Sequence, residues 1–169
     1  DFGIATTYGE YLNMPLGQVF VDHLPPTILI NIYSTLIGVP IGLGLGILAA
    51  LKKNKWQDQV INVFIILLIS VPSVVLALLL QYSICFKLGW FPLTMSTSDQ
   101  YFTWDVFRSM LPAVFALCLG SIAGYARFTR AELSEVLTGE FMLLARTKGL
   151  TKSQAIYRHA MRNSMVVIF

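Results

Sequence analysis

The sequence predicts an all-α protein, a bundle of helices that cross a membrane, and three observations lead to this prediction. Hydrophobic residues make up 56% of the chain and charged residues only 12%, against about 45–50% and about 25% in soluble proteins. Charged residues are absent from three runs, 24–51, 59–86 and 109–126. Each run is long enough for a helix that crosses the bilayer, which needs roughly 20 apolar residues. The basic residues are also distributed unevenly between the loops.

The N-terminal segment, residues 1–24, is predicted to lie outside the cytoplasm because it carries Asp and Glu but no Lys or Arg. Of the twelve Lys and Arg residues, ten follow the first or the third run and only two flank the loop between the second and the third. Lys and Arg accumulate in cytoplasmic loops. The ten basic residues predicted to be cytoplasmic are Lys52, Lys53, Lys55, Arg127, Arg130, Arg146, Lys148, Lys152, Arg158 and Arg162.

The first two predicted spans, about 26–51 and 59–86, contain glycines and prolines with structural consequences. Pro25 and Pro26 mark the expected start of the first span. Gly38, Gly42 and Gly46 follow one another at intervals of four residues, a spacing of small residues that lets another helix approach closely. Pro40 and Pro72 each remove a backbone hydrogen bond and are expected to bend their helices. Two interpretations are open: simple helix packing, which we favour, and bent helices that line a pathway of changing shape.

The third predicted span, about 110–126, follows an outer loop rich in aromatic residues. Aromatic side chains at this depth usually form a belt at the membrane interface, but a vestibule for a substrate is an alternative that the sequence does not separate from the belt. Cys85 and Cys118 lie in apolar runs. We interpret both as small packing residues, because a disulfide is unusual in that setting.

A cytoplasmic segment after the third span, residues 139–164, is predicted to hold two short helices. The first covers 140–148, carries an apolar side and ends at Gly149, which we expect to adopt a positive φ. The second begins at Lys152, because Thr151 and Gln154 form the S/T-x-x-E/Q capping box. A short capped helix with an exposed apolar side is suited to docking against a partner.

The runs ARTKGL and YRHAMRNS in this segment resemble the cytoplasmic loop of ATP-binding-cassette importer permeases, in particular the peptide and nickel branch. In that family the loop, called the EAA motif, docks into a cleft on a separate ATPase subunit. The family's Glu-Ala-Ala falls on Leu143, Leu144 and Ala145, so only the last alanine and Gly149 match the general pattern. His159, Met161 and Arg162 replace the usual ending, which is similar to the R-H-A-L-R-N run of oligopeptide permeases.

The resemblance implies the type I importer permease fold, of which this chain covers the middle. In the family one helix precedes this region and further helices follow, and the chain is expected to begin another span near 164–169. Residues 25–169 then form the transmembrane domain, with a cytoplasmic coupling region at 127–163. We predict ATPase contact or its support for a set of residues in this region. They are Glu140, Phe141, Leu144, Ala145, Arg146, Lys148, Gly149, Lys152, Tyr157, Arg158 and His159.

The sequence lacks the G-x-x-x-x-G-K-[ST] phosphate loop, so we expect ATP to be bound by a partner subunit and no cofactor by this chain. His23 and His159 have no ligand neighbours at metal spacing, and a metal site, a catalytic site and a nucleic-acid partner are not expected. The three spans carry no ionisable Asp, Glu, Lys or Arg for a proton or ion relay. Transport powered by this chain alone is therefore disfavoured.

The leading hypothesis is a permease subunit of an ATP-driven importer for peptides, a multi-pass protein of a bacterial cytoplasmic membrane. The resemblance implies four kinds of partner: a second, homologous permease, two ATP-binding subunits, an extracytoplasmic substrate-binding protein and membrane lipid. A permease for nickel or another small solute is the alternative within transport. A membrane scaffold or enzyme subunit is the alternative from another class.

Overall fold

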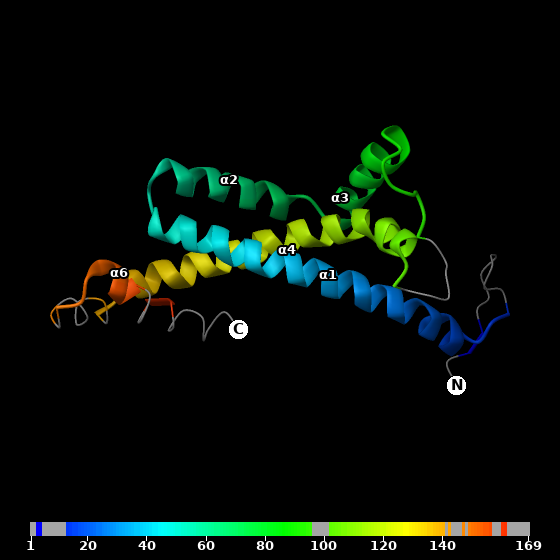
Figure 1. Cartoon of the computed structure of the whole chain (residues 1–169), viewed down its shortest axis with the longest axis horizontal. Helices are drawn as coiled ribbons and strands as arrows, with labels where there is room; N and C mark the ends of the chain where they lie inside the picture. Colours follow the sequence, from blue (N-terminus) through cyan, green and yellow to red (C-terminus); the bar gives the residue numbers. More distant parts are fainter. Residues whose placement is uncertain are drawn as a thin grey trace.

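The computed structural model describes residues 3–4, 13–95, 102–140, 142, 147, 149–156 and 160–161. Within these residues the chain has helices and no strand, apart from an isolated bridge between Ile4 and Pro15. Two long helices lie side by side, the helices of the segment 56–87 lie on one side of them, and a short helix after residue 151 lies near one end (Figure 1). The predicted all-α class is therefore confirmed. The predicted start of a further span at 164–169 lies outside the described residues.

The first long helix, α1, spans Leu16–Leu51 and is longer than the predicted span. Pro25 and Pro26 lie inside it, so the prediction that they mark its start was wrong, and part of the segment 1–24 is helical. Proline fixes φ near −65°, which is compatible with a helix. The two prolines therefore remove backbone hydrogen bonds without ending α1. Pro40 also lies within the continuous helix.

The second predicted span, 59–86, is a broken helix. α2 spans Trp56–Ser70, α3 spans Ser73–Leu80, and a π-helix, η1, continues from Gln81 to Lys87. The two halves meet at an angle of 93°. Val71 is extended, with φ −94° and ψ 123°, because the residue before a proline is driven away from the helical conformation. The expected bend at Pro72 is thus a complete break.

The second long helix, α4, spans Trp104–Thr138. It extends past both ends of the predicted span 110–126, and the first part of the predicted coupling region, residues 127–138, continues α4. The absence of charge marks which residues can enter hydrocarbon, whereas the helix ends where backbone hydrogen bonding ends. Among the residues that the structure describes, two helices, α1 and α4, are long and apolar enough to cross a membrane, and the bent pair adds a third candidate if it counts as one span.

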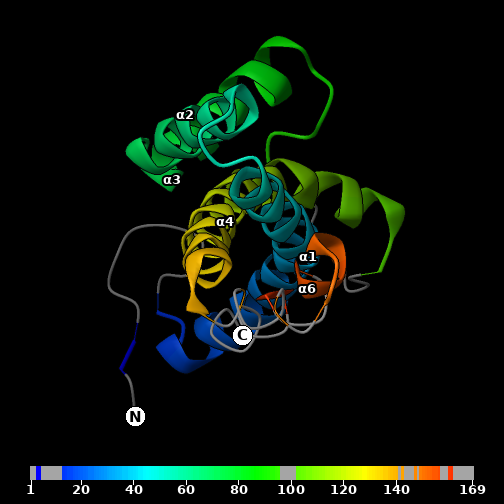
Figure 2. The ribbon, with the colours of Figure 1, turned by 90° about the vertical axis from the view of Figure 1, so that its left-hand side faces the viewer.

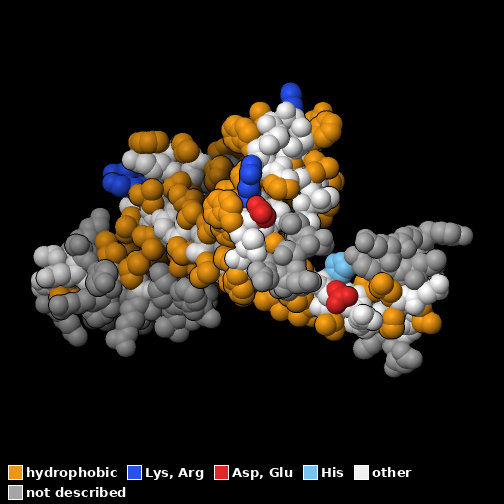
Figure 3. All heavy atoms as spheres, turned by 45° about the vertical axis from the view of Figure 1, so that its right-hand side comes forward, with side chains coloured by type: hydrophobic (Ala, Val, Ile, Leu, Met, Phe, Trp, Pro, Cys, Tyr) orange, Lys and Arg blue, Asp and Glu red, His pale blue; other side chains and the backbone are white. Residues whose placement is uncertain are grey.

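The core lies along the contact between α1 and α4, which run in the same direction (Figures 1 and 2). One buried cluster joins α1, α2 and α4 and contains Ala49, Ile61, Ile65, Ala123 and Ala126. A second cluster, Val106, Met110 and Val114, packs with Leu29, Ile30 and Tyr33 near the start of α4. Hydrophobic side chains also cover much of the described surface in Figure 3, as expected for helices that face lipid.

Candidate functional site

The part of the predicted coupling region that follows α4, residues 139–163, is called the coupling region from here on. The structure describes it in part. Glu140 is exposed just beyond the end of α4, and Lys152 begins α6, which spans Lys152–Ala155. Gly149 has a φ of +80°, as expected for a glycine that ends a helix. A Cβ at Gly149 would meet nothing within 4 Å, so only its backbone conformation excludes a side chain. The other predicted coupling residues lie outside the described residues: Phe141, Leu144, Ala145, Arg146, Lys148, Tyr157, Arg158 and His159.

The predicted capping box at the start of α6 is confirmed. The backbone N–H of Gln154 donates to Thr151 Oγ1 at 3.4 Å, and the backbone N–H of Thr151 donates to Gln154 Oε1 at 3.2 Å. These two bonds satisfy N–H groups that have no partner within a helix. The start of α6 is therefore set by its own sequence.

A buried cluster connects this region to the ends of the two long helices. Its members come from three places along the chain: Ala50 of α1, Leu133 of α4, and Met142, Ala155 and Ala160 of the coupling region. Leu150 packs against it as well. We call these five buried residues the coupling cluster. Packed apolar side chains move together, so the coupling region and the ends of α1 and α4 form one connected unit.

The glycines of α1 face α4 in a regular register. A Cβ at Gly38 would lie 2.9 Å from Ser121 Cβ, at Gly42 2.8 Å from Tyr125 Cβ and at Gly46 2.6 Å from Thr129 Cβ. Each step of four residues on α1 matches a step of four on α4, which requires the two helices to run parallel. One further step leads to Ala50 and Leu133, both in the coupling cluster. The glycine contact thus continues into the coupling cluster.

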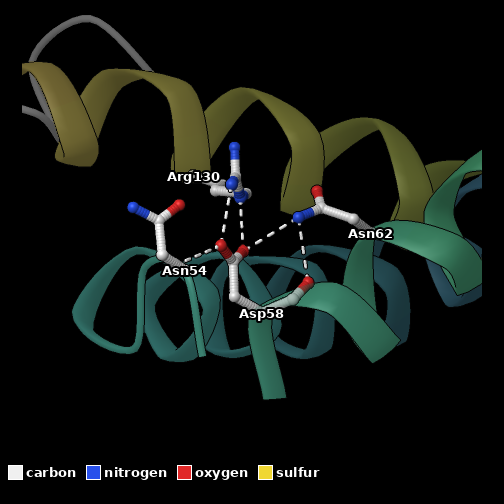
Figure 4. Close-up of polar contacts among 4 residues, drawn as sticks. All are labelled: Asn54, Asp58, Asn62 and Arg130. Atoms are coloured by element: carbon white, nitrogen blue, oxygen red, sulfur yellow. Dashed lines mark hydrogen bonds and ion pairs between the residues drawn. The ribbon is translucent and has the colours of Figure 1, made fainter. Parts of the chain in front are cut away.

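A polar site between α2 and α4 was missed by the sequence analysis (Figure 4). Arg130 Nε donates to Asp58 Oδ1 at 2.6 Å, and Arg130 Nη2 donates to Asp58 Oδ2 at 2.8 Å. The backbone N–H of Asn54 donates to Oδ2 at 3.0 Å, and Asn62 Nδ2 donates to Oδ1 at 2.9 Å. Asp58 is only 2% exposed. We call these four residues the polar clamp.

The predicted spans themselves carry no Asp, Glu, Lys or Arg, but the observed helices α2 and α4 extend beyond them and contain Asp58 and Arg130. Both lie just outside the predicted spans, at the same side of the membrane in the predicted topology. Asp58 precedes the second predicted span and Arg130 follows the third, so both lie at the same end of neighbouring spans. Their opposite charges at this end could have indicated an ion pair from the sequence. A bidentate pair of hydrogen bonds from an arginine to a carboxylate is among the stronger polar contacts in proteins.

An open cavity of about 470 Å³ lies beside the polar clamp, between α2 and α4. It is lined by Asn62, Ile65, Ile66, Ile69, Ser70, Arg127, Arg130 and Ala131. The part of α2 that approaches the break at Val71 is therefore not closely packed against α4. Within the described residues, no group of three or more His, Cys, Asp and Glu could hold a metal ion.

The long apolar helices and the broken span define a multi-pass helical membrane protein. The family model described as "Binding-protein-dependent transport system inner membrane component" matches residues 42–169, and the chain belongs to this family. This confirms the resemblance to importer permeases that the cytoplasmic segment indicates.

Three relatives carry names that refer to the transport of a peptide, a dipeptide or glutathione. The chain is 32% identical to a putative peptide transport system permease protein of Brucella suis, over 93% of this chain and 50% of that protein. It is 30% identical to a dipeptide transport system permease protein of Lactococcus lactis, over 92% and 49%. It is 31% identical to a glutathione transport system permease protein of Escherichia coli, over 99% and 51%. The chain spans about half the length of these relatives.

Proposed function

We propose that the chain is part of the permease subunit of an ATP-driven importer that moves peptides across a bacterial cytoplasmic membrane. The single observation that carries the coupling to ATP is the coupling cluster, which joins the segment after α4 to the ends of α1 and α4. A partner that moves this segment would move both long helices. Family membership and the peptide, dipeptide and glutathione transporters among the relatives support transport and the substrate class.

In the proposed mechanism, a separate ATPase subunit contacts the coupling residues from Glu140 to His159 named above. Movement of the ATPase subunit tilts α1 and α4 and switches access to the pathway between the two sides of the membrane. The chain lacks a phosphate loop, so the ATPase subunit binds ATP and the permease supplies the path. The relatives' names favour a peptide over nickel or another small solute.

The proposed partners are those that the resemblance implies, and the description of the family as a component of a binding-protein-dependent system supports the first of them. They are an extracytoplasmic substrate-binding protein, a second permease and two ATP-binding subunits. Lipid surrounds the apolar outer surface. The basic residues of the coupling region face the cytoplasm in this arrangement, where they lie within reach of the ATPase subunit and of anionic lipid.

The first prediction tests the coupling role of Gly149 in the full-length permease. Gly149→Val forces a side chain onto a φ of +80°, which only glycine adopts readily, and so changes the angle between the two cytoplasmic helices. We expect loss of the co-purifying ATPase subunit, or ATP hydrolysis without uptake, while membrane insertion stays normal. Leu144→Asp, which places a charge on the predicted docking side, should have the same effect.

The matched control is Gly89→Val, because Gly89 also has a positive φ, +64°, and open space around it. It lies in the outer loop, away from the coupling region. Normal ATPase binding and uptake in both Gly149→Val and Leu144→Asp would overturn the coupling role. Equal loss of ATPase binding in Gly89→Val would show that backbone strain alone, wherever it occurs, causes the defect.

A further inference from the structure

The polar clamp joins three parts of the chain at one carboxylate. Asn54 belongs to the turn after α1, Asp58 and Asn62 belong to α2, and Arg130 belongs to α4. Four N–H groups donate to the two oxygens of Asp58, so the carboxylate has a partner in each direction. The clamp therefore holds the turn and the beginning of α2 to α4 in one fixed geometry.

The clamp lies close to the coupling cluster at the ends of both long helices. Arg130 precedes Leu133 by three residues on α4, and Asn54 follows Ala50 by four residues at the end of α1. Arg130 and Leu133 therefore lie about one turn of 3.6 residues apart on α4, and Asn54 lies in the turn that follows α1. The coupling cluster contains no residue of α2 among those described. The clamp thus adds a polar connection between α2 and the end of α4 that contacts the coupling region, beside the apolar contacts of Ile61 and Ile65.

The ion pair is partly buried, with 27% of the Arg130 side chain and 3% of the Asp58 side chain exposed, and a pair that is withdrawn from water is an unusual way to add stability. Replacing such a pair by well-packed apolar residues is often neutral or stabilising, whereas removing one partner is strongly destabilising because the other charge stays buried. Apolar packing is available at this place, since Ile61 and Ile65 already pack against Ala123 and Ala126. The ion pair adds a fixed orientation of α2 relative to α4 and a fixed distance between them. Both are set by the bidentate hydrogen bonds of the arginine.

α2 is held firmly near its N-terminus and is less closely packed near its C-terminus. Its N-terminal part is clamped to α4, the cavity of about 470 Å³ opens beside its C-terminal part, and it ends at the break before Pro72. α3 lies beyond the break at 93° and packs against α4 and η1, not against α2. The backbone at Val71 and Pro72 is the place where a change in angle between α2 and α3 costs no helical hydrogen bond.

We propose that the polar clamp is a positioning device that passes movement of the coupling region to α2. α1, α2 and α4 then move as one unit. The backbone at Val71–Pro72 accommodates their displacement relative to α3. Asp58 and Arg130 are positioning residues in this scheme, because they act through the helices that they join. The inference rests on the proposed function as an ATP-driven permease.

The second prediction tests this role in the full-length permease within the complete transporter, reconstituted in liposomes. The measured quantity is the amount of peptide taken up per ATP hydrolysed. Asp58→Asn removes the charge but keeps the shape of the side chain, and we expect the ratio to fall on the order of tenfold, within the usual range of coupling between sites. Arg130→Lys keeps the charge without the two-pronged bond and should give a smaller loss. Lys53→Gln, an exposed change in the same loop, should leave the ratio unchanged.

A second readout follows α2 directly. Spin labels at Val60 of α2 and Phe128 of α4, both exposed, should keep one distance with and without ATP in the otherwise unaltered transporter. In Asp58→Asn the distance should differ between the two states. If Asp58→Asn does not accumulate in the membrane, the double variant Asp58→Asn with Arg130→Gln replaces it, because it leaves no unpaired buried charge.

The outcomes separate this inference from the proposed function. An unchanged uptake ratio in the clamp variants, or a distance between Val60 and Phe128 that already changes with ATP in the unaltered transporter, would overturn the positioning role and leave the permease function standing. Failure of the unaltered protein to take up peptide, or to co-purify with an ATPase, would overturn the proposed function itself.

Discussion

Gly38, Gly42 and Gly46 show, at the scale of single residues, that the contact between α1 and α4 tightens along its length. A Cβ on the three glycines would lie 3.4, 2.9 and 2.7 Å from the backbone oxygens of Cys118, Ile122 and Ala126. The backbone of α4 cannot yield as a side chain can. The two long helices therefore approach most closely at the end nearest the coupling cluster, where a rigid connection matters most for the proposed mechanism.

The third prediction follows from the decreasing distance between the glycine Cβ positions and the backbone of α4 along α1. Gly46→Ala should destabilise the purified full-length permease more than Gly38→Ala, by about 1–3 kcal/mol as is usual for overpacking, because its Cβ would meet a backbone oxygen at 2.7 Å. Gly44→Ala is the control: Gly44 faces open space on the same helix, and alanine is the better helix former. Thermal unfolding would measure the effect. Equal midpoints for Gly44→Ala and Gly46→Ala would contradict the close approach.

The broken second span is the main feature at the scale of elements. Pro72 removes one N–H and holds Val71 in an extended conformation, yet the packing of α3 against α4 also favours the bend. Pro40 and Pro112 lie in helices that remain continuous. Both halves of the broken span pack against α4, but only α2 also packs against α1.

The fourth prediction separates the two causes of the bend. Spin labels at Val60 and Tyr82, both exposed, would lie about 33 Å apart in a straight helix and about 23 Å apart at a right angle, from a rise of 1.5 Å per residue. Pro72→Ala should broaden the measured distances towards the longer value, because the helical conformation becomes accessible at Val71. Pro40→Ala should leave them unchanged. An unaltered distribution in Pro72→Ala would assign the bend to packing alone.

The same elements show how far the sequence alone could predict this structure. Charge exclusion indicated the helices, and the spacing of Thr151 and Gln154 indicated the start of α6, because each signal is local. The break at Pro72 was predicted only as a bend, since the outcome depends on what α2 and α3 pack against. The polar clamp was missed because Asp58 and Arg130 are separated by 72 residues and become neighbours only where α2 packs against α4.

For the whole molecule, the parallel register of α1 and α4 has a topological consequence. Both helices run from the same side of the membrane to the other, so the start of α2 and the coupling region lie on one side (Figures 1 and 2). That side carries Lys52, Lys53 and Lys55 after α1 and the basic residues after α4. Structure and charge distribution thus place the coupling cluster and the polar clamp at the same, basic end of the bundle.

The fifth prediction tests this orientation in spheroplasts that contain the full-length permease. Because the basic end should face the cytoplasm, a membrane-impermeant thiol reagent should label Leu93→Cys, an exposed position in the outer loop, and should label Lys53→Cys only after the membrane is permeabilised. Cys85 and Cys118 are buried, and replacing both by alanine, together with any cysteine elsewhere in the full-length permease, removes background labelling. Labelling of Lys53→Cys from outside, with Leu93→Cys protected, would invert the topology and move the coupling region away from any cytoplasmic ATPase.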